Sequence, residues 1–397
     1  MRILIIANFV DNFDTSRFTD LAKMLAQSHE VELITSDFAH MKKGKKDKPD
    51  VTGYKLTFIH ESGYKKNISL KRFISHAKFG KNVKKYLALI QPPDLIYCAV
   101  PSLECCYYAA KYAKKHDIPY VIDVQDLWPE AFQMVFRVPI LSTLLFAPFK
   151  RKANYIYKSA DEIIAVSDTY CRRVLQVNKK TTQSLSVFLG TYLSVFDTNA
   201  RENAVEKQDP SEFWLAYCGT LGSSYDLRCA MDAIALLQSK GVENIRFKVM
   251  GDGPLRSTFE AYAAEKKINA EFFGYMPYPK MCGLLSACDV AINPITHGSA
   301  ASIINKHGDY AAAGIPVINT QESAEYRSLV ESYQMGYNCE NGDAEDMASK
   351  IELLLKDENL RKSLGEGARK CAEERFDRNR SYKRIVEVLE KYEKPTK

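Results

Sequence analysis

Short apolar runs alternate with helix-like segments along the first half of the chain. Residues 2–7 form an apolar run, residues 17–27 carry apolar side chains at helical spacing, and residues 31–35 form a second apolar run. The alternation continues to an apolar run at 162–167. Strands that alternate with helices are typical of a parallel sheet covered by helices, so we predict a doubly wound α/β domain.

The same pattern restarts after a polar stretch. Residues 197–212 are charged and poor in large apolar side chains, as in a linker, and strand-like and helix-like segments alternate again over 213–320. We therefore predict a second Rossmann-like α/β domain, a boundary near residue 200, and a ligand site in a cleft between the domains. The expected parts are 1–200, 201–375 and a C-terminal helix, 376–397, that packs back on the first domain.

Composition and charge narrow the class of protein. The 397 residues are 46% hydrophobic and 26% charged, which supplies a core and excludes a disordered chain. Residues 1–200 hold 29 Lys and Arg against 19 Asp and Glu, whereas the remainder is slightly acidic. A basic first half favours an anionic surface as a partner, although the run 41–48 is equally typical of a solvated loop. Outside the run 41–48, the basic residues of this half concentrate at Lys65, Lys66, Lys71, Arg72, Lys78, Lys81, Lys84 and Lys85.

Cysteine usage and the first residues indicate the compartment. The ten cysteines are scattered and form no CxxC pair, so we expect reduced core thiols and no disulfide framework. The chain starts with a short apolar run that leads at once into Asn8 and Asp11, without the features of a signal peptide. These observations predict a cytoplasmic protein.

Several kinds of chemistry lack their motifs. No glycine follows the first strand, and the GxG at Gly251 and Gly253 has Arg256 where a dinucleotide fingerprint needs a third glycine. There is no Walker sequence, no GxSxG and no His/Cys zinc set, and His297 and His307 are interpreted as loop or cap residues. We expect no cofactor and no metal.

The most informative segment is 292–320. A strand ends, a loop of small residues follows, and a helix is predicted to begin near Gly308. A helix start with Lys306 beside it favours a diphosphate, and Asp309 is then placed to accept hydrogen bonds from ribose hydroxyls. The alternative is that Asp309 is an ordinary acid of a first helical turn and Lys306 a solvated side chain.

Four motifs of the second half carry a resemblance to a known family. They are VMGDGPLR (249–256), FFGYMP (272–277), SACDVAINP (286–294) and DYAAAGIPVI (309–318). These motifs resemble the nucleotide-sugar domain of retaining glycosyltransferases of the GT-B fold, in particular family four. The first half adds VIDVQDLWPEAF (121–132) and SADEIIAVS (159–167). These two, and the run from Lys306 to Tyr310, are similar to the subgroup that acts on N-acetylated amino sugars in cell-surface polysaccharide assembly.

The resemblance assigns roles to the residues of the second half. It implies that Asp309 binds the ribose of a nucleoside diphosphate, and that Lys306 and the loop Gly298–Ser302, with Gly298 and Ser299, face the diphosphate. It also implies a retaining reaction in which the acceptor hydroxyl attacks on the face from which the diphosphate leaves. The strand-end turn of Gly251, Asp252 and Gly253 is expected near the base or ribose.

The chain departs from the family at two places. Many members carry an Arg and a Lys after the strand-end glycine, but Gly219 is followed by no cation before Arg228. Either the backbone N–H groups of the turn from Gly219 through Gly222 to Ser224, or Arg228, is expected to replace them. The first carboxylate of the family's Glu pair aligns with Ala301.

The first domain offers candidates for the acceptor site. By resemblance, Asp126 faces the acceptor or the donor sugar, and Asn8 and Arg17 lie where acceptor contacts are found in the family. The alternatives are that Asp126 caps a helix and that Arg17 pairs with Asp14 or Asp20 at the surface. The candidate catalytic residues are Asp126 of the first domain and Lys306 of the second.

An apolar and then basic segment, 135–152, indicates either an element that faces lipid head groups or an ordinary core helix. The combined prediction is a hexosyltransferase at the cytoplasmic face of an anionic membrane. It would move an N-acetylated hexosamine or related sugar from a UDP-sugar donor to a lipid-linked or polysaccharide acceptor, with no nucleic acid as partner. A nucleotide-sugar 2-epimerase and a non-catalytic nucleic-acid binder remain the alternative functions.

Overall fold

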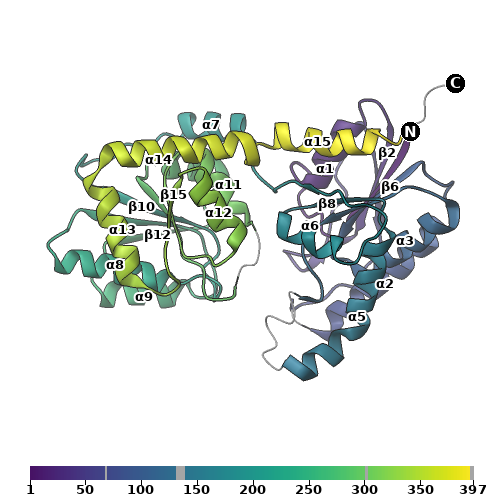
Figure 1. The fold of residues 1–397 in the computed structure, drawn as a ribbon, viewed down its shortest axis with the longest axis horizontal. Coiled ribbons are helices and arrows are strands. Elements are labelled where there is room, and N and C mark those ends of the chain that lie inside the picture. The colour runs from purple at the N-terminus through teal and green to yellow at the C-terminus, as the bar shows by residue number, and fades with distance from the viewer. Residues whose placement is uncertain (68, 131–138, 300–302, 394–397) are drawn as a thin grey trace. The chain divides into compact units, whose positions relative to one another are not determined.

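The computed structural model describes residues 1–67, 69–130, 139–299 and 303–393 and, within these, only the backbone of 139–145. The chain folds into two compact units. Unit 1 comprises Met1–Val187 together with Tyr382–Lys397, and unit 2 comprises Phe188–Ser381. Each unit is a Rossmann-like α/β structure, so the predicted fold class is confirmed (Figure 1).

Unit 1 contains a seven-stranded parallel sheet in the order β5-β2-β1-β6-β7-β8-β9. Its strands are β1 (Arg2–Ile6), β2 (Glu30–Ser36), β5 (Lys55–Ile59), β6 (Leu95–Val100), β7 (Tyr120–Val124), β8 (Glu162–Ala165) and β9 (Leu185–Ser186), beside a small antiparallel pair, β3 (Phe38–Ala39) and β4 (Gly44–Lys45). Its helices are α1 (Arg17–Leu25), α2 (Leu70–Leu87), α3 (Leu103–His116), α5 (Pro139–Ser159), α6 (Asp168–Leu175) and the end of α15 (Arg378–Glu390).

The two faces of this sheet receive different helices because successive side chains of a strand point to opposite sides. Ile3 and Ile5 of β1 face a core completed by Leu21 of α1 and by Ile385 and Leu389 of α15. Helices α2, α3 and α5 lie together on the other side (Figure 1). The last helix of the chain therefore contributes to the core that the first strand begins.

Unit 2 contains a six-stranded parallel sheet in the order β12-β11-β10-β13-β14-β15. Its strands are β10 (Phe213–Cys218), β11 (Ile245–Met250), β12 (Ala270–Gly274), β13 (Val290–Asn293), β14 (Val317–Asn319) and β15 (Gly336–Asn338). Its helices are α7 (Leu193–Glu202), α8 (Leu227–Ser239), α9 (Arg256–Glu265), α10 (Tyr278–Ser286), α11 (Asn305–Ala312), α12 (Ala324–Ser332), α13 (Ala344–Lys356) and α14 (Glu358–Cys371), with a π-helical turn, η1 (Ala372–Phe376).

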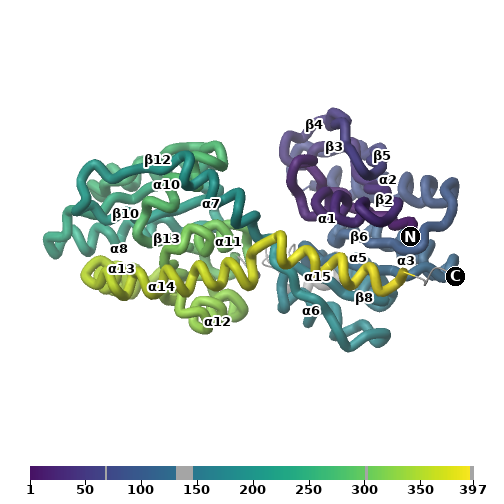
Figure 2. The backbone as a smooth tube through the Cα atoms, turned by 90° about the horizontal axis from the view of Figure 1, so that it is seen from above, coloured from purple at the N-terminus to yellow at the C-terminus, as the bar shows by residue number. Residues whose placement is uncertain are grey.

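The sheet of unit 2 has a hydrophobic core on each face. Leu215 and Tyr217 of β10 pack with α8, α9 and α13, whereas Ala216 and Cys218 pack with α7, α10, α11, α12 and α14. Figures 1 and 2 show α14 and α11 on one side of the strands and α8 on the other. The near-continuous apolar strands of the sequence are thus explained by burial on both faces.

Two local predictions need correction. Residues 193–202 form helix α7, so the polar stretch read as a linker is partly helical, and the units divide between Val187 and Phe188 rather than near residue 200. Helix α11 begins at Asn305, so Lys306 lies inside its first turn rather than before it. Among the helices of the described residues, none combines the length and apolarity that a membrane span requires.

The interior of unit 1 contains a charged pair. Arg17 of α1, 3% exposed, donates from Nε to Asp123 of β7 at 2.6 Å and from Nη1 to the carbonyl of Val187 at 2.7 Å. Asp123 is fully buried and also accepts from the hydroxyl of Tyr97. A buried ion is tolerated only when its partners satisfy it, so this pair fixes how α1 sits on the sheet.

We predict that Asp123→Asn lowers the free energy of unfolding of unit 1 by about 3–5 kcal/mol, because it leaves the Arg17 guanidinium buried without its counter-ion. The chain has two tryptophans, Trp128 in unit 1 and Trp214 in unit 2. Urea unfolding followed by Trp128 fluorescence in a Trp214→Phe background reads unit 1 alone.

The matched control for this prediction is Glu30→Gln, which also lies in unit 1. Glu30 pairs with Arg2 at 3.6 Å, but its side chain is 76% exposed. Its loss is expected to change stability by less than about 1 kcal/mol. Equal effects of the two substitutions would contradict the structural role of the buried pair.

Candidate functional site

Two glycine turns meet at the carboxyl edge of the sheet of unit 2. The N–H of Gly219, after β10, donates to Met250, and the N–H of Leu221 donates to Asp252, each at 2.9 Å. A Cβ added to Gly251 would lie 1.8 Å from the carbonyl oxygen of Gly219, and one on Gly253 would lie 2.4 Å from that of Leu221. The structure therefore brings these predicted site residues together, and only glycine permits this approach.

The ammonium of Lys306 lies at the same turn. Its Nζ is 4.1 Å from the ring centre of Tyr217 and 3.9 Å from that of Tyr225, and it would be 3.4 Å from a Cβ on Gly219. The residue is 8% exposed, and its Nζ has no hydrogen-bond partner among the described residues. The alternative of a solvated lysine is wrong.

Burial lowers the pKa of Lys306 to about 7, because removing the ammonium from water disfavours the charged form. The two tyrosine rings offset part of this penalty through their faces. An unpaired buried cation is costly, so an anion at the Gly219 turn would stabilise it.

Asp309 lies three residues further along α11 and has different neighbours. Its carboxylate accepts a hydrogen bond from the hydroxyl of Tyr278 at 2.9 Å, and that hydroxyl lies 2.7 Å from Oγ1 of Thr191. Burial raises the pKa of Asp309 to about 6, and the hydrogen bond from Tyr278 opposes this rise. Asp309 is thus held by a side-chain network rather than serving as a free acid of a helix start.

The loop before α11 is hydrogen-bonded to other loops at the carboxyl edge of the unit 2 sheet. Gly298 donates its N–H to Glu322 at 3.0 Å, and Ser299 donates its N–H to Thr296 at 3.0 Å. The N–H of Thr296 in turn donates to the carbonyl of Ser224 at 3.0 Å, which joins this loop to the turn that contains Gly222. Residues 300–302, which include Ala301 and the end of the predicted diphosphate loop, lie outside the described residues.

The replacement expected from Arg228 does not occur in the structure. The guanidinium of Arg228 lies over the ring of Tyr262, 5.1 Å from its centre. The N–H groups of Gly219 and Leu221 are also already donated within the edge, so they cannot receive a phosphate as well. Lys306 is therefore the cation at this turn among the described residues.

The two histidines of this segment have structural partners, as the sequence suggested. The Nδ1 of His307 accepts from the N–H of Ile304 at 3.3 Å, and its ring stacks on Tyr326. His297 pairs with Glu322 at 2.6 Å on the surface. No group of three or more metal-binding side chains is found among the residues that the structure describes.

In unit 1, Asn8 and Asp126 follow strands at the carboxyl edge of the sheet. Asn8 is 3% exposed and donates to the hydroxyl of Ser102 at 3.4 Å. Asp126 accepts from the N–H of Leu127 at 2.9 Å and from the indole N–H of Trp128 at 3.0 Å. Burial raises the pKa of Asp126. The helix that Asp126 would cap falls partly at 131–138, outside the described residues.

Arg17 does not join Asn8 and Asp126. Its guanidinium is buried against Asp123, so the surface pairing with Asp14 or Asp20 is wrong. Both hydrogen bonds to Asp123 and the bond to Val187 point into the interior. Arg17 is therefore an interior residue, and the prediction that it lies in an acceptor site is wrong.

Sequence reasoning missed the groups that surround the predicted residues. Tyr278 and Thr191 hold Asp309, and Tyr217 and Tyr225 enclose Lys306. Tyr278 follows β12 at the carboxyl edge of the sheet, so its place after a predicted strand was a usable signal. Thr191 precedes unit 2's first strand by a long stretch of chain, and no spacing pointed to it.

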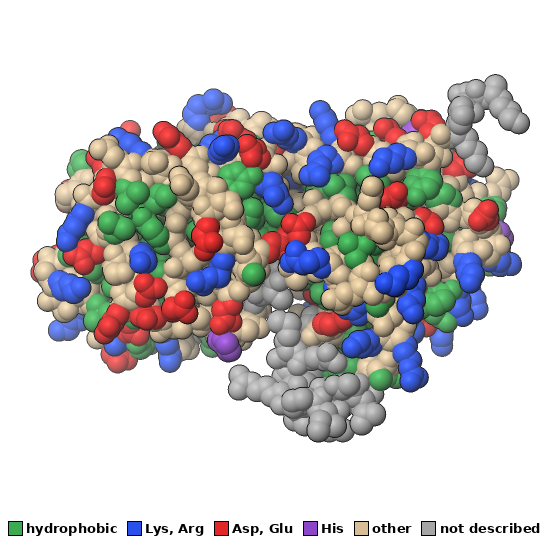
Figure 3. Space-filling view, in the orientation of Figure 1, with side chains coloured by type: hydrophobic (Ala, Val, Ile, Leu, Met, Phe, Trp, Pro, Cys, Tyr) green, Lys and Arg blue, Asp and Glu red, His purple; other side chains and the backbone are tan. Residues whose placement is uncertain are grey.

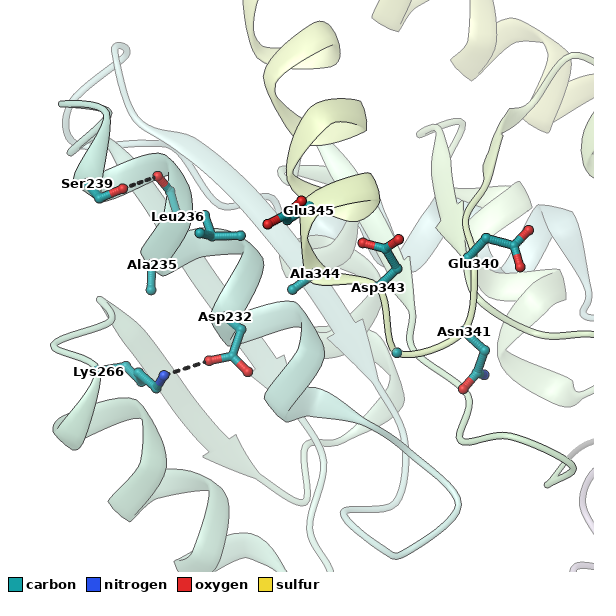
Figure 4. Close-up of a pocket in the computed structure, with 11 residues that line it drawn as sticks. Asp232, Ala235, Leu236, Ser239, Lys266, Glu340, Asn341, Asp343, Ala344 and Glu345 are labelled. Atoms are coloured by element: carbon teal, nitrogen blue, oxygen red, sulfur yellow. Dashed lines mark hydrogen bonds and ion pairs between the residues drawn. The ribbon is translucent and has the colours of Figure 1, made fainter.

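A surface pocket of about 720 Å³ lies elsewhere in unit 2, between α8 and α13 (Figure 4). Its lining includes Asp232, Glu340, Asp343 and Glu345, and Lys266 is already paired with Asp232 at 3.0 Å. An acidic surface of this kind repels a diphosphate. The pocket is therefore a poor candidate for a nucleotide site.

Two family models match this chain in succession. Residues 16–182 match Glycosyltransferase Family 4, and residues 199–371 match Glycosyl transferases group 1. HepE from Anabaena, solved in complex with UDP, superposes with a TM-score of 0.69 at 17% identity over 98% of this chain and 100% of that one. The chain is a GT-B glycosyltransferase of the group 1 and family 4 type.

Curated relatives match this glycosyltransferase over shorter stretches. A GDP-mannose-dependent alpha-(1-6)-phosphatidylinositol dimannoside mannosyltransferase of Mycobacterium tuberculosis is 31% identical over 36% of this chain and 37% of its own length. The capsular polysaccharide biosynthesis glycosyltransferase CapM of Staphylococcus aureus is 23% identical over 55% of this chain and 58% of its own length. The aligned parts thus span less than two thirds of the length of these relatives. The matched families and relatives are glycosyltransferases, so they favour neither the epimerase nor the nucleic-acid binder.

We predict that Lys306 makes the stability of unit 2 depend on pH. Its pKa is about 7 in the fold, against about 10.4 when unfolded, so between pH 7 and 10 the unfolded chain binds more protons and stability rises with pH. Lys306→Met has no ammonium to titrate at this position. From pH 7 to pH 9.5 the free energy of unfolding of the parent protein should therefore rise by about 2–4 kcal/mol relative to that of Lys306→Met, which changes the stability gap between the two proteins by the same amount.

This gap is measured by urea unfolding at the two pH values, followed by Trp214 fluorescence in a Trp128→Phe background. Comparison of the two proteins at each pH cancels the titration of the buried cysteines and tyrosines, which both retain. A gap that stays constant would show that the ammonium is not desolvated.

Proposed function

We propose that this glycosyltransferase transfers a sugar from a UDP-sugar bound at the carboxyl edge of the unit 2 sheet. The observation that carries the proposal is the buried ammonium of Lys306 at the Gly219 turn, which has no hydrogen-bond partner among the described residues. A diphosphate would supply the missing counter-charge. During transfer the diphosphate leaves the sugar as a charged group, and this is the step at which a nearby cation lowers the barrier most.

The donor's nucleoside would contact Asp309 and the turn of Gly251, Asp252 and Gly253. Asp309 is ionised above its pKa of about 6, so at neutral pH it accepts hydrogen bonds from ribose hydroxyls. Tyr278 occupies part of its carboxylate and orients the rest. Anabaena HepE was solved with UDP and with UDP-glucose, which supports uridine, whereas the mycobacterial relative is named for GDP-mannose.

The transfer itself would be retaining, with the acceptor hydroxyl attacking on the face from which the diphosphate leaves. Lys306 stabilises the leaving group, and the rest of the rate enhancement comes from positioning. Asp126 and Asn8, at the edge of unit 1, would meet the acceptor. We assign an N-acetylated hexosamine or related sugar as the transferred group and a glycan or lipid-linked acceptor, in keeping with the relative named for capsular polysaccharide biosynthesis.

Asp309→Ala is expected to weaken UDP binding by about 1–3 kcal/mol, through the loss of charge-assisted hydrogen bonds to the ribose. Isothermal titration of UDP, GDP and ADP against the full chain measures the effect and the base preference together. The matched control is Glu345→Ala, which removes an exposed carboxylate from the pocket between α8 and α13.

Unchanged UDP affinity in Asp309→Ala would exclude Asp309 from the ribose site. Preferential binding of GDP by the parent protein would overturn the uridine assignment and leave the sugar-nucleotide site standing. Absence of binding by all three nucleotides would contradict the proposed function itself.

We also propose that unit 1 associates peripherally with an anionic membrane on the cytoplasmic side. Lys and Arg side chains are numerous on the face of unit 1 that Figure 3 shows. The run 41–48 is less available than its sequence indicated, because Lys46 is buried beside Asp11 and Lys43 donates to Asn67. The exposed lysines Lys42, Lys65, Lys66 and Lys71 would therefore carry the attraction.

Changing Lys42, Lys65, Lys66 and Lys71 to Gln together should lower binding to phosphatidylserine-containing vesicles by about 1 kcal/mol for each charge near the surface. Vesicle sedimentation at low and high salt measures this. The control changes Lys240, Lys280, Lys362 and Lys370, all exposed in unit 2, to Gln. Equal losses from the two sets would contradict a specific membrane face.

A further inference from the structure

Aromatic rings from five separate places in the chain of unit 1 converge beside Asp126. Phe9 lies 5.1 Å from His40, 5.3 Å from His76 and 6.4 Å from Trp128, measured between ring centres. His76 stacks on Trp128 at 5.4 Å with an angle of 18° between the planes, and Tyr64 lies 5.7 Å from His76. We call these five rings, Phe9, His40, Tyr64, His76 and Trp128, the aromatic cluster.

Two cations lie against the aromatic cluster. The guanidinium of Arg72, on α2, is 4.5 Å from the ring centre of Trp128 and 5.6 Å from that of Tyr64, and Nη1 donates to the carbonyl of Asn67 at 3.0 Å. The Nζ of Lys43 is 4.8 Å from the ring centre of Tyr64 and donates to Oδ1 of Asn67, which leaves two of its three N–H donors for an anion. A guanidinium whose face lies on aromatic rings presents its N–H edge to an oxyanion, and a second cation near the same ring can meet the same group.

The two cations act on the titratable groups around them. Burial, together with the charges of Lys43 and Arg72, lowers the pKa of His40 to about 4. Burial also lowers the pKa of Lys43, and the charge of Arg72 adds to this. The nearby carboxylates have other partners. Asp11 accepts from the N–H groups of His40 and Met41 and lies 3.3 Å from Lys46.

The remaining two acids are similarly engaged. Glu61 is buried with a raised pKa and accepts from the hydroxyl of Ser75 at 2.8 Å. Asp126 accepts from Leu127 and from the indole of Trp128, which fixes the ring beneath Arg72. Burial lowers the pKa of Arg72, and the charges of Asp126 and Glu61 oppose that lowering.

Unsatisfied polar atoms point to the same place. His76 is 5% exposed, and its Nε2 lies 3.9 Å from Oε1 of Glu61, beyond hydrogen-bond distance. Neither of its ring nitrogens has a hydrogen-bond partner among the described residues. Burial and the charge of Arg72 lower its pKa to about 3, so the ring is neutral and can donate one hydrogen bond and accept another. A buried imidazole without partners is costly unless a ligand or water supplies them.

An apolar cavity adjoins the aromatic cluster and shares two of its residues. The cavity has a volume of about 310 Å³ and is lined by Trp128 and His76 together with Phe73, Ile74, Leu103 and Phe149. The charged residues of its lining, Glu104 and Lys152, are paired with each other. The space next to the two cations therefore suits a hydrocarbon chain rather than a second polar group.

We propose that this place binds an alkyl or prenyl phosphate, with the phosphate at Arg72 and Lys43 and the hydrocarbon chain in the cavity of Phe73, Ile74, Leu103 and Phe149. A phosphate monoester carries up to two charges and three oxygens, which suits two cations near one ring better than a carboxylate does. The inference deepens the proposed function and rests on it for its meaning, since it names the chemical class of the acceptor's carrier. The binding itself needs no donor.

The test is calorimetric titration of the full chain with farnesyl phosphate below its micelle concentration, alongside farnesol, farnesoic acid and inorganic phosphate. Farnesyl phosphate should bind at least about tenfold more tightly than each of the other three. Arg72→Gln should weaken farnesyl phosphate about tenfold, and Ile74→Glu should weaken it by a similar factor because a charge then stands at the cavity.

Matched controls exist on the same helix and just beyond it. Lys81→Gln removes an exposed charge of α2, and Leu89→Glu adds a charge at a side chain 85% exposed, as Ile74→Glu does at one 58% exposed. Both controls should bind farnesyl phosphate like the parent protein. Retained UDP binding by Arg72→Gln would show that unit 2 is intact.

Equal binding of inorganic phosphate would overturn the role of the cavity, and equal binding of farnesoic acid would overturn the phosphate assignment. Loss of affinity in both controls, or none in Arg72→Gln, would overturn the site. Failure of the proposed function appears separately, as the absence of nucleotide binding by a chain that still binds farnesyl phosphate.

Discussion

Parallel strand pairing is the constraint on which the rest of this protein depends. Every strand of the two main sheets runs parallel to its neighbours, so the chain must cross back over the sheet between strands, and the loops that follow the strands all gather at one edge. The turn of Gly219, the turn of Gly251 and the helix start at Asn305 are far apart in the sequence. They meet because each follows a strand of one sheet. The same reason places Asn8 and Asp126 at the edge of unit 1.

Arg17 and Lys306, two of the buried cations among the described residues, illustrate opposite uses of desolvation. Arg17 is matched by Asp123 and by a carbonyl, and all of its described contacts lie in the interior. Among the described residues, Lys306 contacts the faces of two tyrosines and has no hydrogen-bond partner for its ammonium. A matched ion stabilises one arrangement of the fold, whereas a buried ion without a counter-charge is stabilised by binding an anion.

Helix α2 gives unit 1 a surface with two chemistries side by side. Arg72 and His76 lie one turn apart and face the aromatic cluster, while Phe73 and Ile74 line the apolar cavity. A ligand that meets both must itself be charged at one end and apolar along its length. At the glycine turns of unit 2, the residues that the structure describes show no comparable combination, and small residues with one ammonium suit a compact polar anion. The two edges thus differ in the ligands they suit.

The sequence by itself determined the fold class, because runs of apolar residues buried on both faces and separated by helical periods have few other ways to fold. It also located the glycine turns, Lys306 and Asp309, since each is next to a predicted strand end or helix start. Only the tertiary structure decided that Arg17 belongs to the interior, that Lys306 is desolvated between two tyrosines, and that Arg72 lies on Trp128. Those outcomes depend on which side chains from distant strands and helices come within a few ångströms, and on the water they exclude. The local periodicity of the sequence carries no information about these long-range contacts or about the exclusion of water.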